Sequence, residues 1–113
     1  MSVSLLRDEI PSGTLYMLIL TTLARHGELH GFEIAGHIEQ LSEDVLRVEE
    51  GSLYPALQRM LVKAWVKAEW GVTAGNRRAR YYKLTAAGRK QLLAEVGQYQ
   101  RVSSAIQRIL CAG

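Results

Sequence analysis

Residues 51–84 read GSLYPALQRMLVKAWVKAEWGVTAGNRRARYYKL, and this stretch decides the fold. Apolar residues recur at helical spacing in its first third, which predicts a short helix with one buried face. The remainder carries tryptophan, valine and tyrosine on both sides of Gly75-Asn76, a pattern typical of two strands joined in a hairpin. The order helix, strand, turn, strand is that of the second half of a winged helix-turn-helix.

The helix, expected over residues 52–63, has an apolar and a polar side. Its inward residues are Leu53, Leu57, Met60 and Leu61, and its outward residues are Pro55, Gln58, Arg59 and Val62, flanked by Ser52 and Lys63. We expect the N-cap at Gly51 or Ser52, which places Pro55 close to the start, where its missing N–H costs little. The outward side bears Arg59 and Lys63 without acidic neighbours, which indicates an anionic partner rather than an ordinary solvated helix face.

The hairpin is basic at and beyond its turn. Arg77, Arg78 and Arg80 follow Asn76, and Lys83 extends the same charge. Charge on an edge hairpin can also serve only to prevent aggregation. That reading does not explain why a basic helix lies next to the hairpin in sequence. Together the two elements favour binding to duplex DNA.

Four segments carry a resemblance to a known family: GSLYPALQRM (51–60), KAEW (67–70), RRARYYKLTAAGRKQL (77–92) and HGFEIAGHI (30–38). Taken together they resemble the PadR family of bacterial transcriptional regulators, in its short subgroup with a single C-terminal helix. The resemblance covers nearly the whole chain. It implies a repressor that works as a homodimer on a palindromic operator, and it implies that Ser52 and Tyr54 contact phosphate.

The predicted DNA-binding residues are Ser52, Tyr54, Pro55, Gln58, Arg59, Lys63, Arg77, Arg78 and Arg80. Gln58 and Arg59 are the candidates for reading base edges in the major groove. Lys63 and the three arginines of the hairpin are expected to supply non-specific affinity. Two such helices related by a dyad would meet half-sites about 34 Å apart.

Charge and length agree with this interpretation. The chain has 113 residues, which suits one domain. Residues 1–50 carry a net charge of −6 and residues 51–113 a net charge of +9, so the second half is the one suited to an anionic partner. A single cysteine, Cys111, permits no internal disulfide and fits a reducing cytoplasm. We expect no membrane span and no signal peptide.

Helices are also expected over residues 12–25, ended by Gly27, and over residues 31–41. The inward residues of the first are Leu15, Leu18, Ile19, Thr22 and Leu23, and those of the second are Phe32, Ala35, Ile38 and Leu41, widened by Ile34. Residues 45–48 suggest a short strand that pairs with the hairpin into a three-stranded sheet. Trp65 and Trp70 are interpreted as sheet residues packed against helices. The family usually has glycine where Ala64 stands, so we expect an altered exit from the preceding helix.

The last helix, over residues 86–110 and capped by Thr85, has heptad spacing at Leu92, Val96, Tyr99, Ser103, Ile106 and Leu110. A terminal helix with so much apolar surface needs a partner, either its own domain or a second subunit. The resemblance favours a dimer. It also implies a possible aromatic or lipophilic effector at the dimer interface, although no tryptophan follows Trp70 to grip one.

No catalytic residue, metal ligand set or cofactor is expected, because no known motif spacing surrounds the serines or the three histidines. The expected architecture is mainly α (α+β). A winged helix-turn-helix occupies residues 1–84 and a dimerisation helix residues 85–113. The alternative function is that of a winged-helix module that docks on another protein without binding DNA.

Overall fold

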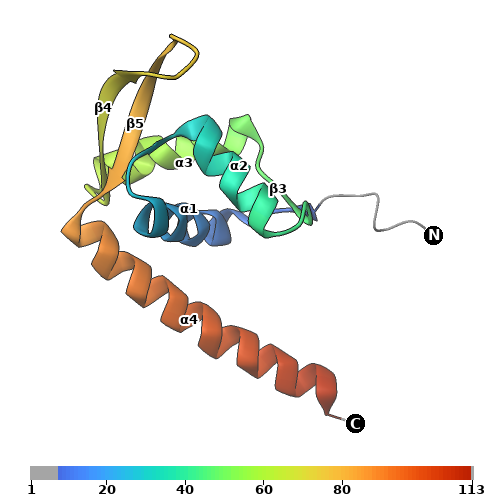
Figure 1. Cartoon of the computed structure of the whole chain (residues 1–113). Coiled ribbons are helices and arrows are strands. Elements are labelled where there is room, and N and C mark those ends of the chain that lie inside the picture. The colour runs from blue at the N-terminus through green and yellow to red at the C-terminus, as the bar shows by residue number, and fades with distance from the viewer. Residues whose placement is uncertain (1–7, 113) are drawn as a thin grey trace.

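The computed structural model describes residues 8–112. Its helices are α1 (Ser12–His26), α2 (Gly31–Leu41), α3 (Glu50–Val62) and α4 (Ala86–Cys111). Its strands are β1 (Asp8–Glu9), β2 (Leu29–His30), β3 (Leu46–Arg47), β4 (Val66–Val72) and β5 (Arg78–Leu84). In Figure 1 the first three helices form the body, the β4–β5 hairpin projects from one side, and α4 runs out along another. The expected winged helix-turn-helix with a long C-terminal helix is confirmed.

The core lies where α1, α2 and α3 meet beneath the base of the hairpin. Its fully buried side chains are Ile19, Leu20, Leu23, Ile34, Leu53, Leu57 and Met60. Each such aliphatic side chain contributes about 1.5–3 kcal/mol of stabilisation by leaving water. The inward faces predicted for α1 and α3 are confirmed, since Leu15, Ile19 and Leu23 and then Leu53, Leu57 and Met60 are all buried.

The three-stranded sheet has the order β2-β5-β4. Seven register pairs join β4 to β5, from Val66 opposite Leu84 to Val72 opposite Arg78. The expectation that residues 45–48 supply the third strand is wrong, because that place is taken by Leu29 and His30 of β2. Glu43 and Asp44 have φ values of 53° and 63° and turn the chain after α2. This turn carries β3 to the N-terminal segment, where it pairs in parallel with β1.

The buried stripe of α2 differs from the one expected. Phe32 is 82% exposed and Leu41 is exposed as well, whereas Gly31, Ile34 and Ile38 are buried. The aromatic ring of Tyr54 lies so close to Gly31 that a Cβ there would come within 2.8 Å of the Tyr54 hydroxyl. Glycine at position 31 therefore turns inward against Tyr54. The buried stripe of α2 begins at Gly31, one residue before the predicted start at Phe32.

The start of α3 also differs. Glu49 is its N-cap and makes no side-chain capping bond, so neither Gly51 nor Ser52 caps the helix. Pro55 consequently lies in the second turn, where its missing N–H leaves the carbonyl of Gly51 without its usual intrahelical donor. Gly51 and Pro55 are both exposed residues of this helix.

The end of α3 is a Schellman motif. Ala64 has a φ of 61°, its N–H donates to the carbonyl of Leu61, and the N–H of Trp65 donates to the carbonyl of Met60. Alanine thus keeps the left-handed exit that glycine usually provides, and the altered exit expected from the sequence is absent. The cost is the steric strain of a Cβ in the left-handed region.

The beginning of α4 is joined to this exit. Thr85 caps α4 as expected, since its Oγ1 accepts from the N–H of Gly88 at 3.0 Å. The same hydroxyl donates to the carbonyl of Ala64 at 2.6 Å, and the N–H of Thr85 donates to the carbonyl of Trp65 at 3.0 Å. Within residues 8–112, no helix combines the length and apolarity that a bilayer crossing requires.

Candidate nucleic-acid interface

The start of α2, the start of α3 and the tip of the hairpin meet around a concavity of about 500 Å³. Its lining residues are His30, Gly31, Phe32, Tyr54, Thr73, Arg77, Arg78, Ala79, Arg80 and Tyr82. Four of the residues predicted to bind DNA are among them: Tyr54 and the three arginines. Residues as distant in sequence as His30 and Tyr82 therefore share one surface.

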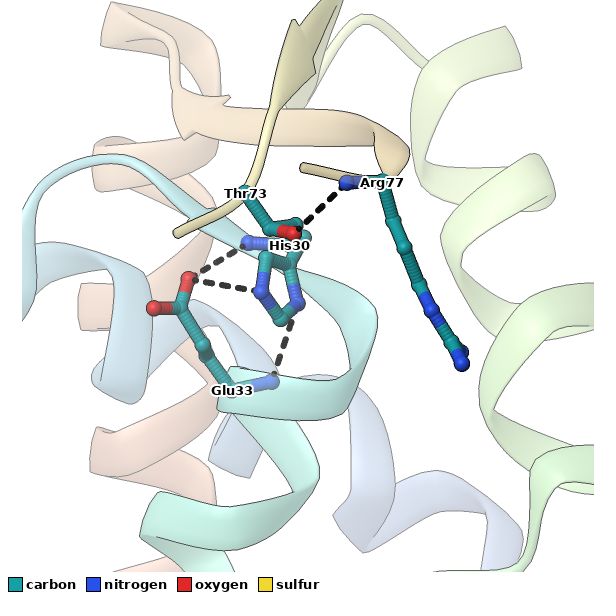
Figure 2. Close-up of polar contacts among 4 residues, drawn as sticks. All are labelled: His30, Glu33, Thr73 and Arg77. Carbon is teal, nitrogen blue, oxygen red and sulfur yellow. Dashed lines mark hydrogen bonds and ion pairs between the residues drawn. The ribbon is translucent and has the colours of Figure 1, made fainter. Parts of the chain in front are cut away.

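The first turn of α2 forms one wall of the concavity. His30 is its N-cap: its Nδ1 accepts from the N–H of Glu33 at 3.3 Å, and the carboxylate of Glu33 accepts from the N–H of His30 at 3.1 Å. This is a capping box in which histidine replaces the usual serine or threonine. Figure 2 shows the bonds, with Glu33 and Arg77 on opposite sides of the imidazole. The helix N-terminus beside this wall has the partial positive charge that suits a phosphate.

The second wall is Tyr54 of α3, which is partly exposed and packs on Gly31. No side chain larger than hydrogen fits at position 31 without moving this ring. The glycine therefore lets the phenol lie directly over the start of α2. Sequence reasoning named Tyr54 but not Gly31, and the signal available was the HG pair directly before an apolar helix.

The third wall is the hairpin turn. The N–H of Thr73 donates to the carbonyl of Arg77 at 2.8 Å, and the N–H of Asn76 donates to the carbonyl of Thr73 at 2.9 Å. Asn76 has the positive φ, 63°, that was expected at Gly75-Asn76. The hydroxyl of Thr73 accepts from the N–H of Arg77 at 3.2 Å. In Figure 2 the Arg77 side chain extends from this turn between α2 and α3, and no contact is drawn to its guanidinium.

The two further arginines of β5 lie against Trp70 of β4. The guanidinium carbon of Arg78 is 4.6 Å from the centroid of the Trp70 ring system, and that of Arg80 is 5.8 Å away. Trp70 is 61% exposed, so the expectation that it packs against a helix is wrong. Trp65, by contrast, is partly buried and meets Tyr16 of α1 edge to face.

Tyr82 is a buried residue in the lining of the concavity. Burial raises the pKa of the Tyr82 hydroxyl, the charge of Arg80 opposes that rise, and nearby Tyr54 adds to it. The neutral phenol is therefore the form that the fold favours.

The outward side of α3 lies beside the concavity rather than in it. Pro55, Gln58 and Val62 are exposed there, as predicted. Arg59 turns toward α1, where its Nη1 donates to the hydroxyl of Tyr16 at 3.2 Å, and Lys63 Nζ lies 5.3 Å from the centroid of Trp65. Ser52 is exposed near Arg47 and Glu49 at the N-terminal end of the helix. Gln58 and Pro55 are thus free on the surface of α3, whereas Arg59 and Lys63 contact aromatic side chains of the body.

The three histidines do not converge. The rings of His26 and His37 stack with their centroids 3.9 Å apart, while His30 caps α2. Over residues 8–112 no group of three or more potential ligands could hold a metal ion.

The fold and this face define a winged helix-turn-helix protein. The sequence profile described as the transcriptional regulator PadR-like family matches residues 19–94. The chain belongs to that family. Its members regulate transcription by binding DNA and are not enzymes, so the protein is a DNA-binding transcriptional regulator.

Similar proteins agree with this assignment. A PadR family regulator from Clostridium difficile is 28% identical, with a TM-score of 0.72 over 85% of this chain and 97% of that one. A PadR-like regulator from Bacillus cereus is 25% identical, with a TM-score of 0.75 over 89% and 95%. An uncharacterised protein of Lysinibacillus sphaericus is 26% identical over 90% of this chain and 93% of its own length.

Proposed function

We propose that the protein is a cytoplasmic, homodimeric repressor that binds a palindromic operator in duplex DNA. The observation that carries the proposal is the convergence of the α2 N-terminus, Tyr54 and three hairpin arginines on one concave face. A helix N-terminus, a phenol and guanidinium groups are the donors that backbone phosphates take. In this arrangement the concave face follows the DNA backbone, and α3 enters the major groove beside it.

The exposed side of α3 reads the bases. Gln58 lies near the middle of that side, and its amide can pair with both hydrogen-bonding atoms of an adenine edge. Arg59 reaches the same groove after leaving Tyr16 and can pair with guanine. Pro55 and Val62 add apolar contact beside Gln58, while Ser52, Lys63 and Tyr54 bind flanking phosphates.

The helix α4 forms the dimer interface. Only Gly88 of this helix is buried, and three residues of the proposed stripe are exposed: Tyr99 at 51%, Ile106 at 49% and Leu110 at 72%. The stripe as a whole is Leu92, Val96, Tyr99, Ser103, Ile106 and Leu110. The first turns pack on α1, whereas the end of the helix extends beyond the body in Figure 1. An apolar stripe of this length is energetically costly in water, and a second copy of α4 would cover it.

An effector at the dimer interface would occupy the groove between α1 and α4, which Tyr99 of the proposed stripe lines. This groove measures about 440 Å³. Tyr16, Met17, Tyr99 and Val102 give it apolar and aromatic walls, and Gln91 and Glu95 give it polar ones. The aromatic walls support a flat or lipophilic ligand.

Selection of bound sequences from a random duplex pool tests DNA reading and dimerisation together. We expect a palindrome whose half-sites are about one helical turn apart. Enrichment of a single, non-palindromic half-site would contradict the dimer. Absence of any enriched sequence, with no salt-dependent binding to any duplex, would favour the protein-docking alternative.

Paired arginine variants test the concave face. Arg77→Ala with Arg78→Ala should weaken binding to all duplexes and lower the salt slope by about one to two. The matched control is Arg101→Ala with Arg108→Ala, which removes the same charge from the side of α4 opposite the apolar stripe. Equal losses in the two pairs would mean that net charge, rather than the concave face, determines binding.

The dimer is tested by Ile106→Glu, measured by sedimentation. We expect a monomer with intact helix content, because a charge in the centre of an apolar interface is costly to bury. Leu93→Glu, at an exposed position off the stripe, is the control and should leave the dimer intact. A monomeric wild-type protein would contradict this part of the proposal.

A further inference from the structure

Trp70 is a large aromatic residue on the exposed part of the hairpin, and its surroundings suggest a role. In the register of β4 and β5, Trp70 is opposite Arg80 and Val72 is opposite Arg78. Residues two apart on a strand point to the same face, so Trp70, Arg78 and Arg80 share one face of the hairpin. The acidic neighbour Glu69 is adjacent to Trp70 in the strand and therefore points to the other face.

The two guanidinium groups rest on this indole rather than on a carboxylate. Arg78 lies 4.6 Å and Arg80 5.8 Å from the ring, within the range of cation–π attraction. The Nε of Arg80 is buried and has no hydrogen-bond partner among the described residues. Both arginines also line the concavity beside α2 and α3. The ring is thus the group that holds two cationic side chains next to that concavity.

We propose that Trp70 is a positioning residue for DNA binding: its indole face holds the guanidinium groups of Arg78 and Arg80 in the orientation in which they receive phosphate. This inference rests on the proposed function of the concave face. A free arginine loses much side-chain freedom when it binds, and a guanidinium already stacked on a ring loses less. Trp70 therefore increases affinity through the arginines and needs no contact of its own with DNA.

The first test compares two substitutions of the ring. Trp70→Phe keeps an aromatic face, whereas Trp70→Leu keeps apolar bulk and removes the face. We expect Trp70→Leu to weaken binding to the operator about five- to twentyfold, the effect of losing two exposed cation–π contacts. Trp70→Phe should keep most of the wild-type affinity. The salt slope should stay at the wild-type value in both, because the charges remain. Equal losses for the two variants would overturn the proposal.

The second test is a double-mutant cycle with Arg78→Gln and Arg80→Gln. If Trp70 acts through the arginines, Trp70→Leu should change affinity less than about twofold once both are replaced. If the ring contacts DNA itself, or only stabilises the hairpin, the loss caused by Trp70→Leu will persist in that background. Persistence of the loss would overturn the proposal.

The third test needs no DNA and stays valid if Trp70→Leu fails to fold. Arg78→Gln should shift the tryptophan emission maximum of the free protein, because it removes a cation from the Trp70 face. Arg77→Gln is the matched control and should leave the emission unchanged, since Arg77 does not stack on Trp70. Identical spectra for wild type and Arg78→Gln would refute the stacking. A protein that binds no duplex but shows the emission shift would refute the proposed function alone.

Discussion

The hydroxyl of Tyr16 in α1 accepts a hydrogen bond from Nη1 of Arg59 in α3 at 3.2 Å, across 43 positions of sequence. The ring of Tyr16 also meets Trp65 edge to face, with centroids 6.1 Å apart. The same residue lines the groove between α1 and α4. One side chain thus contacts the proposed recognition helix and also lines the groove proposed for effector binding.

Tyr16→Phe should alter the base preference that we propose for Arg59, with little change in stability. The lost hydrogen bond is exposed, so the free energy of unfolding should fall by less than about 1 kcal/mol. Base preference should change at the same operator position that Arg59→Ala relaxes, because both variants act on one guanidinium. Binding selections on the two variants would check this, with Tyr99→Phe in the same groove as the control. Changes at unrelated operator positions would show that Tyr16 does not act through Arg59.

Ala64→Gly should stabilise the protein. Ala64 has a φ of 61°, a conformation that is strained for a side chain with a Cβ and free for glycine. Relief of this strain is partly offset by the greater freedom of glycine in the unfolded chain. The free energy of unfolding should therefore rise by about 0.5–1 kcal/mol. Urea unfolding measures it. Ala87→Gly, on the exposed first turn of α4, should destabilise by a similar amount, and a loss in both variants would rule out strain at position 64.

Gly88→Ala should destabilise the junction between α3 and α4. A Cβ at this position would lie 2.0 Å from the carbonyl oxygen of Trp65, so α4 has to shift away from the body. We expect a loss of about 1–3 kcal/mol, typical of overpacking a close contact. Gly97→Ala in the same helix is the control. A Cβ at Gly97 would have only the far end of the Arg101 side chain nearby, at 3.4 Å. Because alanine has the higher helix propensity, Gly97→Ala should be at least as stable as wild type. Similar thermal unfolding midpoints for the two variants would contradict the claim that the close contact of Gly88 with Trp65 requires glycine.

Tyr82 should make the fold sensitive to alkali. Burial holds the pKa of its hydroxyl above the ordinary value of 10.0, while the unfolded chain keeps that ordinary value. The contribution to stability is therefore complete below about pH 10 and is lost as the pH rises through the folded-state pKa. Unfolding free energies measured from pH 8 to 11 should fall less steeply in Tyr82→Phe than in wild type. Parallel curves would mean that Tyr82 ionises equally in both states.

Local patterns in the sequence were sufficient for much of the fold. The buried face of α3, the glycine that ends α1, the threonine that caps α4 and the positive φ of Asn76 all follow from rules that act within a few residues. The segment resemblances likewise led to the correct family, and its profile covers residues 19–94. Where the prediction failed, the missing information was the position of another element.

Two errors make this plain. Phe32 and Leu41 match a helical stripe, yet the ring of Tyr54 against Gly31 offsets the buried face of α2. Residues 45–48 have strand-type composition, yet the chain reversal at Glu43 and Asp44 and the pairing of β2 with β5 place β3 elsewhere. Composition describes a strand but does not choose its partner.

By itself the sequence determined which segments are helices, where the basic hairpin lies, and which side of α3 faces outward. These properties depend on side-chain periodicity and on backbone preferences of single residues, and both are local. Only the tertiary structure decided that His30, Tyr54 and the hairpin arginines surround one concavity, that Arg59 bonds to Tyr16, and that Trp70 holds Arg78 and Arg80. The physical reason is that such contacts join distant segments, and their geometry exists only after the core has packed those segments together.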